Sequence, residues 1–495
     1  MAEQQVQIDQ LMTSSGVAFG TSGVRGLVVE MTDQVCWLYV SAFIQYLKSS
    51  QQLQVCGKVA VAGDLRFSSP RIMAAAMRAV RDHGCEPINC GHVPTPAVAL
   101  YGFSHELPSM MVTGSHIPDD RNGIKFNTLT GEILKADELA IREQSVSLPD
   151  GQFDSLGKFV QPYLGPEAIA AAHDDYIKRF TDFLPAGCLA GKTIGLYEHS
   201  SVSRDCLKIL LEALGASVIS LGRSEQFISV DTEAIRPEDV VLAQQWASEH
   251  DFACIISTDG DGDRPLVSDE NGNWLRGDVA GILCAEYLQA DRVVTPVSSN
   301  SAVEKSGYFE SVERTRIGSP YVIEAMTALL SSDKAVVGYE ANGGFLQASD
   351  IMRDGKVMRS LPTRDAAMVP LAILLLADKK AMTISTLLMT LPARYTASDR
   401  LKAFSTTLSQ SILATMQTDN HLDNIAAIQQ RFPDLGMPID INTVDGVRMT
   451  FESDDIVHLR PSGNAPELRC YTESASTERA ESLNQSCIAL MKTWH

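Results

Sequence analysis

The segment TGSHIPDDRNGIKF, residues 113–126, is a polar stretch placed between apolar runs. Pro118 and Gly123 disfavour a helix here, and the small and polar neighbours of Ser115 favour a loop that leaves its hydroxyl exposed. Ser115 is therefore a candidate nucleophile, with His116 beside it. The alternative is a plain turn in which the serine hydroxyl bonds only to its own backbone. Further loops of unusual composition, described below, favour the nucleophile.

Length and charge set the class of protein. The chain has 495 residues, which are too many for one hydrophobic core and predict roughly three or four domains of about 100 to 150 residues. It carries 41 Lys and Arg residues against 61 Asp and Glu residues, a net charge of −20. This excess of negative charge argues against nucleic acid or an anionic membrane as a partner. A small anionic substrate fits wherever a few cations gather.

The compartment is indicated by the N-terminus and by the cysteines. The first residues, MAEQQVQIDQ, have neither the basic start nor the apolar core of a signal peptide. No apolar run approaches the 18 or so residues that a membrane span needs. The ten cysteines are scattered, and none forms a Cys-x-x-Cys pair. We therefore expect free thiols in a cytoplasmic protein rather than disulfides or a zinc site.

A strand, helix and strand pattern recurs along the chain. It is predicted for residues 58–91, for 192–221 and again from 292 to 337, and it is typical of parallel α/β units. The last part, from about Pro392, is different. It predicts short strands at 447–451, 456–459 and 468–471, followed by a closing helix after Ser476.

An acidic loop follows an apolar strand in the segment FACIISTDGDGDRP. Asp259, Asp261 and Asp263 alternate with glycines, so their oxygens can converge and require a cation. Oxygen ligands of this kind suit Mg²⁺. Glu270 falls at the twelfth position of a calcium-binding loop counted from Asp259, so calcium and a solvated turn are alternatives. The sixth position is not glycine and no helices bracket the loop, which favours Mg²⁺.

Three other loops have compositions that suit a phosphorylated sugar. FGTSGVRG, residues 19–26, surrounds Arg25 with free backbone N–H groups, or is a plain glycine turn. In GYEANGGF, a carboxylate and an amide can bind neighbouring sugar hydroxyls, although a surface Asn-Gly turn is the alternative. RPSGNAPELR, residues 460–469, combines guanidinium, hydroxyl and amide donors around one bend, as phosphate requires. A turn at Gly318 in TRIGSP can also face a phosphate.

In this order the loops resemble those of the α-D-phosphohexomutases, the family of phosphomannomutases, phosphoglucomutases and phosphoglucosamine mutases. The pairing of TGSHIP with DGDGDR is specific, and the resemblance runs from Phe19 to Tyr471. It implies an α/β fold of four domains around a central cleft, three related α/β domains with mixed sheets and a C-terminal α+β domain with an antiparallel sheet. The expected domains are 1–163 with the phosphoserine loop, 164–273 with the metal loop, 274–388 with the sugar loop and 389–495 with the phosphate loop.

The resemblance also implies a mechanism. Ser115 is expected as a phosphoserine, with one Mg²⁺ per chain held by Asp259, Asp261, Asp263 and a phosphate oxygen. The phosphoryl group passes to the sugar and back through a hexose 1,6-bisphosphate, a reaction dominated by positioning and charge neutralisation. Arg25, His116 and Lys125 are expected to assist catalysis, Lys125 or His116 moving the proton. The phosphosugar is expected to bind Arg264, Gly318, Glu340, Asn342, Arg460, Ser462, Gly463, Asn464 and Arg469.

The sugar loop GYEANGGF resembles chains assigned phosphomannomutase activity, so the expected reaction interconverts mannose 6-phosphate and mannose 1-phosphate. A phosphoglucomutase or a dual-specificity mutase is the alternative. A non-catalytic phosphosugar-binding protein and a Mg²⁺-dependent phosphatase are alternatives of other classes. The family commonly has Glu-x-Ser-Gly-His here, whereas this chain has Asn342 and Gly344, and Ile117 and Asn464 depart from the usual Asn and Thr. The expected partner is the small substrate alone, bound by a monomer or homodimer.

Overall fold

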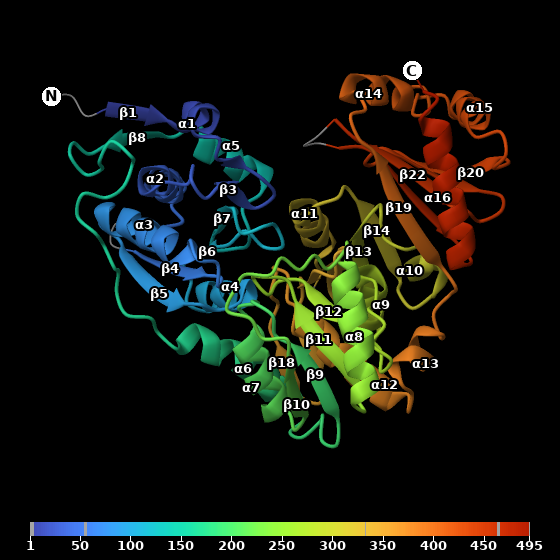
Figure 1. The fold of residues 1–495 in the computed structure, drawn as a ribbon, viewed down its shortest axis with the longest axis horizontal. Helices are drawn as coiled ribbons and strands as arrows, with labels where there is room; N and C mark the ends of the chain where they lie inside the picture. Colours follow the sequence, from blue (N-terminus) through green and yellow to red (C-terminus); the bar gives the residue numbers. More distant parts are fainter. Residues whose placement is uncertain (1–3, 54–56, 332, 463–465, 495) are drawn as a thin grey trace.

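Three of the sheets share one arrangement of four strands. The computed structural model describes residues 4–53, 57–331, 333–462 and 466–494. In Figure 1 the N-terminal sheet, in blue, and the C-terminal sheet, in red, lie at opposite ends of the molecule, with the green and yellow sheets between them. The three α/β sheets are mixed and the C-terminal sheet is antiparallel. The expected fold class is confirmed.

The N-terminal sheet has the strand order β2-β3-β7-β6-β4-β5, in which β5, β4 and β6 are parallel and the others antiparallel. Val59 and Val61 join one core with α2 and α3, whereas Ala60 and Ala62 join another with α4. Because successive side chains of a strand point to opposite faces, helices cover both faces of this sheet. A separate pair, β1 with β8, is antiparallel.

The elements of this first part are β1 (Gln4–Gln7), α1 (Ile8–Ser15), β2 (Ala18–Phe19), β3 (Gly23–Leu27), α2 (Asp33–Ser49), β4 (Lys58–Gly63), α3 (Ser69–Asp82), β5 (Glu86–Gly91), α4 (Thr95–Ser104), β6 (Ser109–Val112), β7 (Arg121–Asn127), α5 (Lys135–Arg142) and β8 (Ser145–Leu148).

The second and third sheets have the orders β10-β9-β11-β12 and β14-β13-β15-β16. In each, three parallel strands are followed by one antiparallel strand, the arrangement of β5-β4-β6-β7 in the first sheet. Their elements are α6 (Ala171–Phe183), β9 (Thr193–Tyr197), α7 (Arg204–Ala213), β10 (Ser217–Leu221), α8 (Pro237–Glu249), β11 (Cys254–Thr258), β12 (Pro265–Val267), α9 (Gly277–Leu288), β13 (Arg292–Pro296), α10 (Ala302–Lys305), β14 (Ser311–Thr315), α11 (Ser319–Leu329), β15 (Val336–Tyr339), β16 (Phe345–Gln347), β17 (Ile351–Arg353), β18 (Lys356–Met358), α12 (Met368–Lys379) and α13 (Ile384–Leu388).

The C-terminal sheet has the order β19-β23-β22-β21-β20. Its inward side chains form a core of their own with the closing helix α16. The elements are β19 (Tyr395–Leu401), α14 (Thr406–Ala414), α15 (His421–Arg431), β20 (Pro438–Asn442), β21 (Val447–Phe451), β22 (Ile456–Pro461), β23 (Leu468–Ser474) and α16 (Thr477–Met491). Among the helices that the structure describes, none has the length and apolar character needed to cross a membrane.

The shared arrangement places three of the predicted loops at the same point of three sheets. The Ser115 loop joins β6 to β7, the aspartate loop joins β11 to β12, and the sugar loop joins β15 to β16. Each loop therefore leaves the carboxyl end of a parallel strand and returns along an antiparallel one. Such strand ends are where α/β sheets bind their ligands.

Candidate active site

A cavity of about 130 Å³ contains Ser115 and adjoins the end of the aspartate loop at Arg264. Its walls come from the glycine-rich segment at residues 20–25, the Ser115 loop, strand β7 and two arginines of later sheets. Of the predicted catalytic and binding residues, the structure brings together Arg25, Ser115, His116, Lys125 and Arg264. Arg364, which no motif in the sequence indicated, also lines this cavity.

Ser115 is buried, not exposed as the loop composition predicted. Its exposed fraction is 1 %, because the aspartate loop lies over it and Asp259 Oδ2 accepts a hydrogen bond from its Oγ at 2.7 Å. Its backbone has a left-handed conformation, with φ of 55°, which costs a non-glycine residue energy and is held by its surroundings. Thr113 Oγ1 contributes by accepting the Ser115 N–H at 2.7 Å.

Arg66 holds the Ser115 loop in this conformation. Its Nη2 donates to the carbonyl oxygens of Ser115 and Ile117 at 2.8 and 2.6 Å, and its Nη1 to those of Pro118 and Arg121 at 2.9 and 3.2 Å. Its Nε pairs with Asp64, which is also fully buried, at 3.1 Å. Burial raises the pKa of Asp64, against the opposing effects of Arg66 and neighbouring hydroxyls. The guanidinium therefore donates to four carbonyl oxygens of this one loop.

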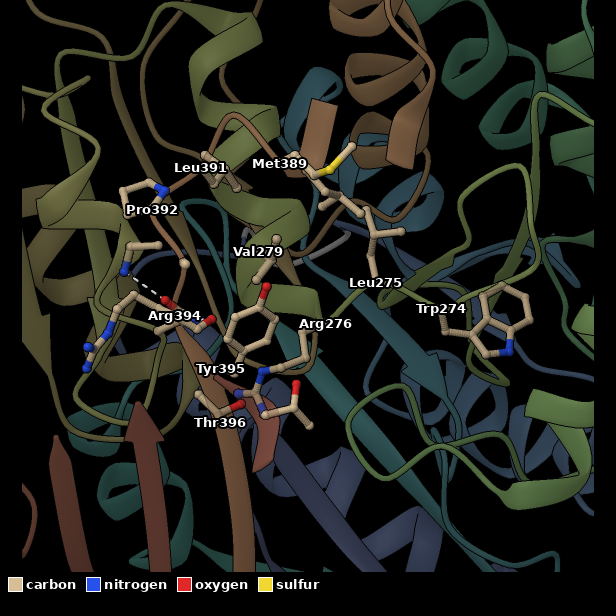
Figure 2. A pocket seen from close by; sticks show the side chains of 15 residues that line it. Trp274, Leu275, Arg276, Val279, Met389, Leu391, Pro392, Arg394, Tyr395 and Thr396 are labelled. Atoms are coloured by element: carbon tan, nitrogen blue, oxygen red, sulfur yellow. Dashed lines mark hydrogen bonds between the residues drawn. The ribbon is translucent and has the colours of Figure 1, made fainter. Parts of the chain in front are cut away.

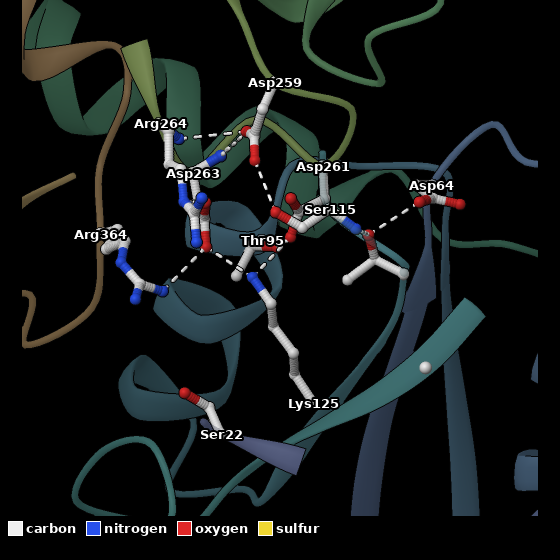
Figure 3. A network of polar contacts seen from close by, with 12 residues as sticks. Ser22, Asp64, Thr95, Ser115, Lys125, Asp259, Asp261, Asp263, Arg264 and Arg364 are labelled. Atoms are coloured by element: carbon white, nitrogen blue, oxygen red, sulfur yellow. Dashed lines mark hydrogen bonds and ion pairs between the residues drawn. The ribbon is translucent and has the colours of Figure 1, made fainter. Parts of the chain in front are cut away.

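Three buried carboxylates face one another beside Ser115. Asp259, Asp261 and Asp263 each offer an oxygen, and these atoms lie within 4.8 Å of one another. Lys125 Nζ lies between two of them, 2.6 Å from Asp261 Oδ2 and 2.5 Å from Asp263 Oδ2 (Figure 3). Burial lowers the pKa of Lys125, but the two carboxylates raise it by more than burial lowers it. The net pKa is above the usual lysine value, so the lysine is protonated.

The three aspartates form a group of buried carboxylates that suits a bound cation. The second oxygens of Asp261 and Asp263, their Oδ1 atoms, are buried without a hydrogen-bond partner. Burial and the two neighbouring carboxylates raise the pKa of Asp259 well above its usual range. Burial has the same effect on Asp261, but Lys125 and Thr95 outweigh it and hold the pKa of Asp261 low. Unpaired carboxylate oxygens at this spacing are ligands for a hard divalent cation, so the group could bind a metal.

His116 is neutral in this arrangement. Its Nδ1 lies 3.3 Å from Ser115 Oγ and accepts a hydrogen bond from Arg264 Nη1 at 2.9 Å, because an arginine can only donate. Burial, and then the charge of Arg264, lower the pKa of His116 to about 4. Burial and Arg264 also lower the pKa of Arg25. The cavity thus combines four cations with one neutral imidazole.

The sugar loop is held by contacts within its own domain and by one contact to the second domain. Glu340 Oε2 accepts from Arg364 Nε at 2.6 Å, and both side chains are almost fully buried. Asn342 uses its Oδ1 to accept the Gly344 N–H and its carbonyl oxygen to accept from Thr232. The Asn342 side-chain oxygen is therefore engaged within the loop.

Gly318 immediately precedes α11, with φ of 131°. The adjacent Ser319 hydroxyl donates to Glu132 of the first sheet's domain, as do Ser22 and Thr363. One buried carboxylate therefore joins the glycine-rich segment, the Gly318 turn and the Arg364 segment.

The predicted phosphate loop lies in the C-terminal domain. Arg460, on β22, pairs with Asp445 at 2.8 Å, and Ser462 donates its backbone N–H to Glu467. Arg469, on β23, is half-buried, and its Nε is buried without a hydrogen-bond partner. None of these three lines the cavity that contains Ser115. Gly463 and Asn464 lie outside the described residues.

A second cavity, of about 520 Å³, lies at the junction of the third and fourth sheets. Figure 2 shows its walls, which include Trp274, Arg276, Met389 and Tyr395. It contains none of the predicted catalytic residues. The smaller cavity around Ser115 is therefore the candidate active site.

The sequence analysis missed several residues of the site. Asp64 and Arg66 follow β4 and Thr95 follows β5, both at the carboxyl ends of parallel strands, so topology alone could have indicated them. Glu132 and Arg364 lie in segments without a motif, and no signal in the sequence indicates them. Each neutralises or orients groups that are remote in the chain.

Comparison with known proteins agrees with this geometry. Models of four phosphoglucomutase/phosphomannomutase domains match the chain in order: alpha/beta/alpha domain I at residues 16–148, domain II at 174–272, domain III at 276–395 and the C-terminal domain at 414–489. The chain belongs to the phosphoglucomutase/phosphomannomutase family. The resemblance drawn from the four loops is confirmed, and with it the expected enzyme class, a phosphohexomutase.

Relatives match over almost the whole chain. A phosphomannomutase of Salmonella muenchen is 43 % identical over 486 residues, covering 98 % of this chain and 97 % of the relative. A phosphomannomutase of Sinorhizobium fredii is 42 % identical over 479 residues, covering 97 % and 99 %. Among solved structures, a phosphoglucomutase/phosphomannomutase family protein of Burkholderia thailandensis has a TM-score of 0.71 at 18 % identity, covering 96 % of this chain and 98 % of that one.

Proposed function

We propose that this chain is a phosphomannomutase that interconverts mannose 6-phosphate and mannose 1-phosphate. The observation that carries the proposal is the contact of Ser115 Oγ with Asp259, inside a cavity lined by Arg25, Lys125 and Arg264. A serine beside three carboxylates and surrounded by cations suits phosphoryl transfer better than hydrolysis of an uncharged bond. The names of the two full-length relatives favour mannose as the sugar.

In the proposed reaction Ser115 carries a phosphoryl group. The free hydroxyl oxygen of a bound sugar monophosphate forms a bond to this phosphorus as the bond to Ser115 Oγ breaks. The proton of that hydroxyl passes by way of Lys125 or His116 to Ser115 Oγ, and the products are a hexose 1,6-bisphosphate and the free serine. After the bisphosphate has turned over, its other phosphoryl group is transferred to Ser115 Oγ, and the serine proton returns to the sugar oxygen from which that group leaves. Atoms and charges balance over the cycle, because each step exchanges one O–P bond for another.

The residues of the chain position and neutralise these groups. Arg25 and Arg264 face the phosphoryl group, and Lys125 is the proposed proton donor, since its neighbours keep it charged. His116, neutral and 3.3 Å from Ser115 Oγ, is the alternative acceptor. We propose that Glu340 and Asn342 bind sugar hydroxyls and that Gly318, Arg460, Ser462, Gly463, Asn464 and Arg469 hold the phosphate that does not react.

Asp259, Asp261 and Asp263 would hold one Mg²⁺, together with an oxygen of the Ser115 phosphate. When bound, Mg²⁺ supplies positive charge to the transferred phosphoryl group. Lys125 Nζ contacts the Oδ2 atoms of Asp261 and Asp263, which would leave their Oδ1 atoms for the metal. We also propose the domain boundaries 163, 273 and 388, a cytoplasmic location, and a monomer or homodimer acting on a small phosphosugar.

The test is Mg²⁺-dependent interconversion of the two mannose phosphates beside the two glucose phosphates, with a trace of hexose bisphosphate. We expect conversion that Ser115→Ala abolishes, with mannose preferred. Faster conversion of glucose phosphates would replace the substrate with glucose. Release of free phosphate instead of isomerisation would indicate a phosphatase. Binding without conversion of either sugar would refute the mutase and leave a phosphosugar-binding protein.

A further inference from the structure

Gly344 and Arg364 compete for one space. A Cβ added at Gly344 would lie 2.5 Å from Arg364 Cδ and 3.0 Å from its Cγ and Nε. Approaches this close require the arginine to move, so a side chain at 344 and the observed position of Arg364 exclude each other. The family's usual sugar loop ends in histidine, whereas this loop has Gly344 at that position. An arginine from another segment, Arg364, occupies the space beside this glycine.

Arg364 is held in this space by hydrogen bonds of the residues next to it in the chain. The backbone around it runs beside β16, where Leu361 N–H donates to Gln347 and Asp365 N–H donates to Phe345 at 2.9 Å. The preceding Thr363 is tied to Glu132 at 3.0 Å. Arg364 is 3 % exposed. A buried cation held in this way is already oriented for a ligand and needs no rearrangement to bind one.

The guanidinium faces the reacting groups as well as its own carboxylate. Its Nε donates to Glu340 at 2.6 Å, while its Nη1 lies 3.4 Å from Asp263 Oδ2. Figure 3 shows Arg364 and Lys125 reaching the same oxygen, Asp263 Oδ2, from different directions. Arg364 lines the cavity that contains Ser115, whereas Glu340 does not. An arginine that served only to pair with Glu340 would have no reason to form part of the cavity wall.

We propose that Arg364 is a further catalytic residue of this chain, whose guanidinium contacts the phosphoryl group transferred between Ser115 and the sugar. The inference rests on the proposed function and deepens it. Arginine stays protonated throughout the physiological range, so Arg364 acts by charge and takes no proton. Gly344 is the residue that makes this possible, because it leaves the space empty.

The experiment separates this role from that of an ion-pair partner. Arg364→Met, Glu340→Gln and the double variant are compared with wild type in steady-state mutase assays and in single-turnover phosphorylation of Ser115 by hexose bisphosphate. If Arg364 contacts the phosphoryl group, Arg364→Met lowers kcat and the phosphorylation rate by about 100-fold, with a smaller change in KM. The same loss appears when Glu340→Gln is the background. Arg359→Met, an exposed arginine of the neighbouring segment, is the matched control and stays at wild-type activity.

A steric test accompanies the first. Gly344→Ala lowers the activity of the wild type, since it displaces Arg364, but has no further effect in Arg364→Ala, where the colliding atoms are gone. Urea unfolding of each variant shows whether it is folded, and Arg364→Lys, which keeps the charge, recovers part of the rate in a variant of nearly unchanged shape.

Two results would overturn the inference alone: no effect of Arg364→Met in the Glu340→Gln background, or a change in KM without a change in phosphorylation rate. A folded wild type that converts neither sugar would instead overturn the proposed function, and this inference with it.

Discussion

Arg66→Met should disorganise the catalytic loop although Arg66 does not line the cavity that contains Ser115. The side chain is 1 % exposed, and its two terminal nitrogens satisfy four carbonyl oxygens of residues 115–121. Methionine fills a similar volume and donates no hydrogen bond. The substitution therefore removes the donors while it largely keeps the packing, including the contact with the ring of Phe227.

The expected loss of stability follows from these contacts. Breaking a buried ion pair by removing one partner costs about 3 to 5 kcal/mol. Asp64 keeps hydrogen bonds from Ser69 and Thr113, which places the cost of its own isolation at the lower end. Each carbonyl left without a donor adds about 1 kcal/mol where water cannot replace it. Pro118 O keeps the Arg121 N–H as a donor, so up to three carbonyls are affected, and we expect a total of about 3 to 6 kcal/mol, a large part of the stability of an ordinary domain.

The assay has two readouts. Urea unfolding followed by circular dichroism gives the stability, and single-turnover phosphorylation of Ser115 gives the catalytic effect, expected as a loss of about 100-fold because small displacements of reacting groups are costly. Arg78→Met is the control, since Arg78 forms a partly exposed helix pair with Asp82 worth about 0.5 kcal/mol. Normal phosphorylation by a stably folded Arg66→Met would refute the idea that this arginine organises the loop.

Three further outcomes test other parts of the structure. Mg²⁺ at about 100 times its Kd should raise the unfolding free energy by about 2.7 kcal/mol, and Asp261→Asn should remove this gain in urea titrations with and without chelator. Burial lowers the pKa values of His199 and His458 to about 4, below the value of about 6.5 in the unfolded chain. Between about pH 6.5 and pH 4 the unfolded state therefore binds more protons than the folded state, and stability falls as pH falls. The expected slope is about 1.4 kcal/mol per pH unit for each histidine, and His199→Gln should reduce it in unfolding curves at pH 7, 6 and 5; an unchanged slope would exclude His199 as a source. Glu473 accepts from Ser301 and from Arg394 Nε at 2.6 Å across the junction of the last two sheets, so Glu473→Leu should cost about 3 kcal/mol and expose the C-terminal sheet to limited proteolysis, whereas wild-type resistance would show that the pair contributes little.

The sequence predicted those elements whose pattern is local. Residues 217–221 and 447–451 were predicted as strands and are β10 and β21, because short apolar runs are bounded there by turn residues. Helices α9 and α12 were not predicted. Nearly all their residues are buried, so they lack the alternation of polar and apolar faces from which a helix is recognised.

The catalytic loops were predictable for a different reason, and only in part. Gly-rich and acidic segments carry unusual composition within a few residues, so Ser115 and the three aspartates could be named from the sequence. The partners that hold them could not. Arg364 and Asp263 are 101 residues apart, and neither the sequence around Arg364 nor its spacing indicates the contact. The burial of Ser115 was mispredicted for the same reason, because the segment that covers it comes from another sheet.

The repetition of one strand arrangement explains why loops so distant in the chain meet. In each of the first three domains the loop between the third and fourth strands of the shared arrangement leaves the carboxyl end of a parallel strand. The carboxyl ends of these strands face one another in the folded chain, which brings the serine, the aspartates and the sugar loop together. The antiparallel C-terminal domain offers no such strand end, and its Arg460 is paired with Asp445. If Arg460 holds a phosphate, the Arg460–Asp445 ion pair must open or be shared with the ligand. Asp445→Asn should therefore tighten binding of inorganic phosphate. An unchanged or weaker affinity would place the phosphate elsewhere.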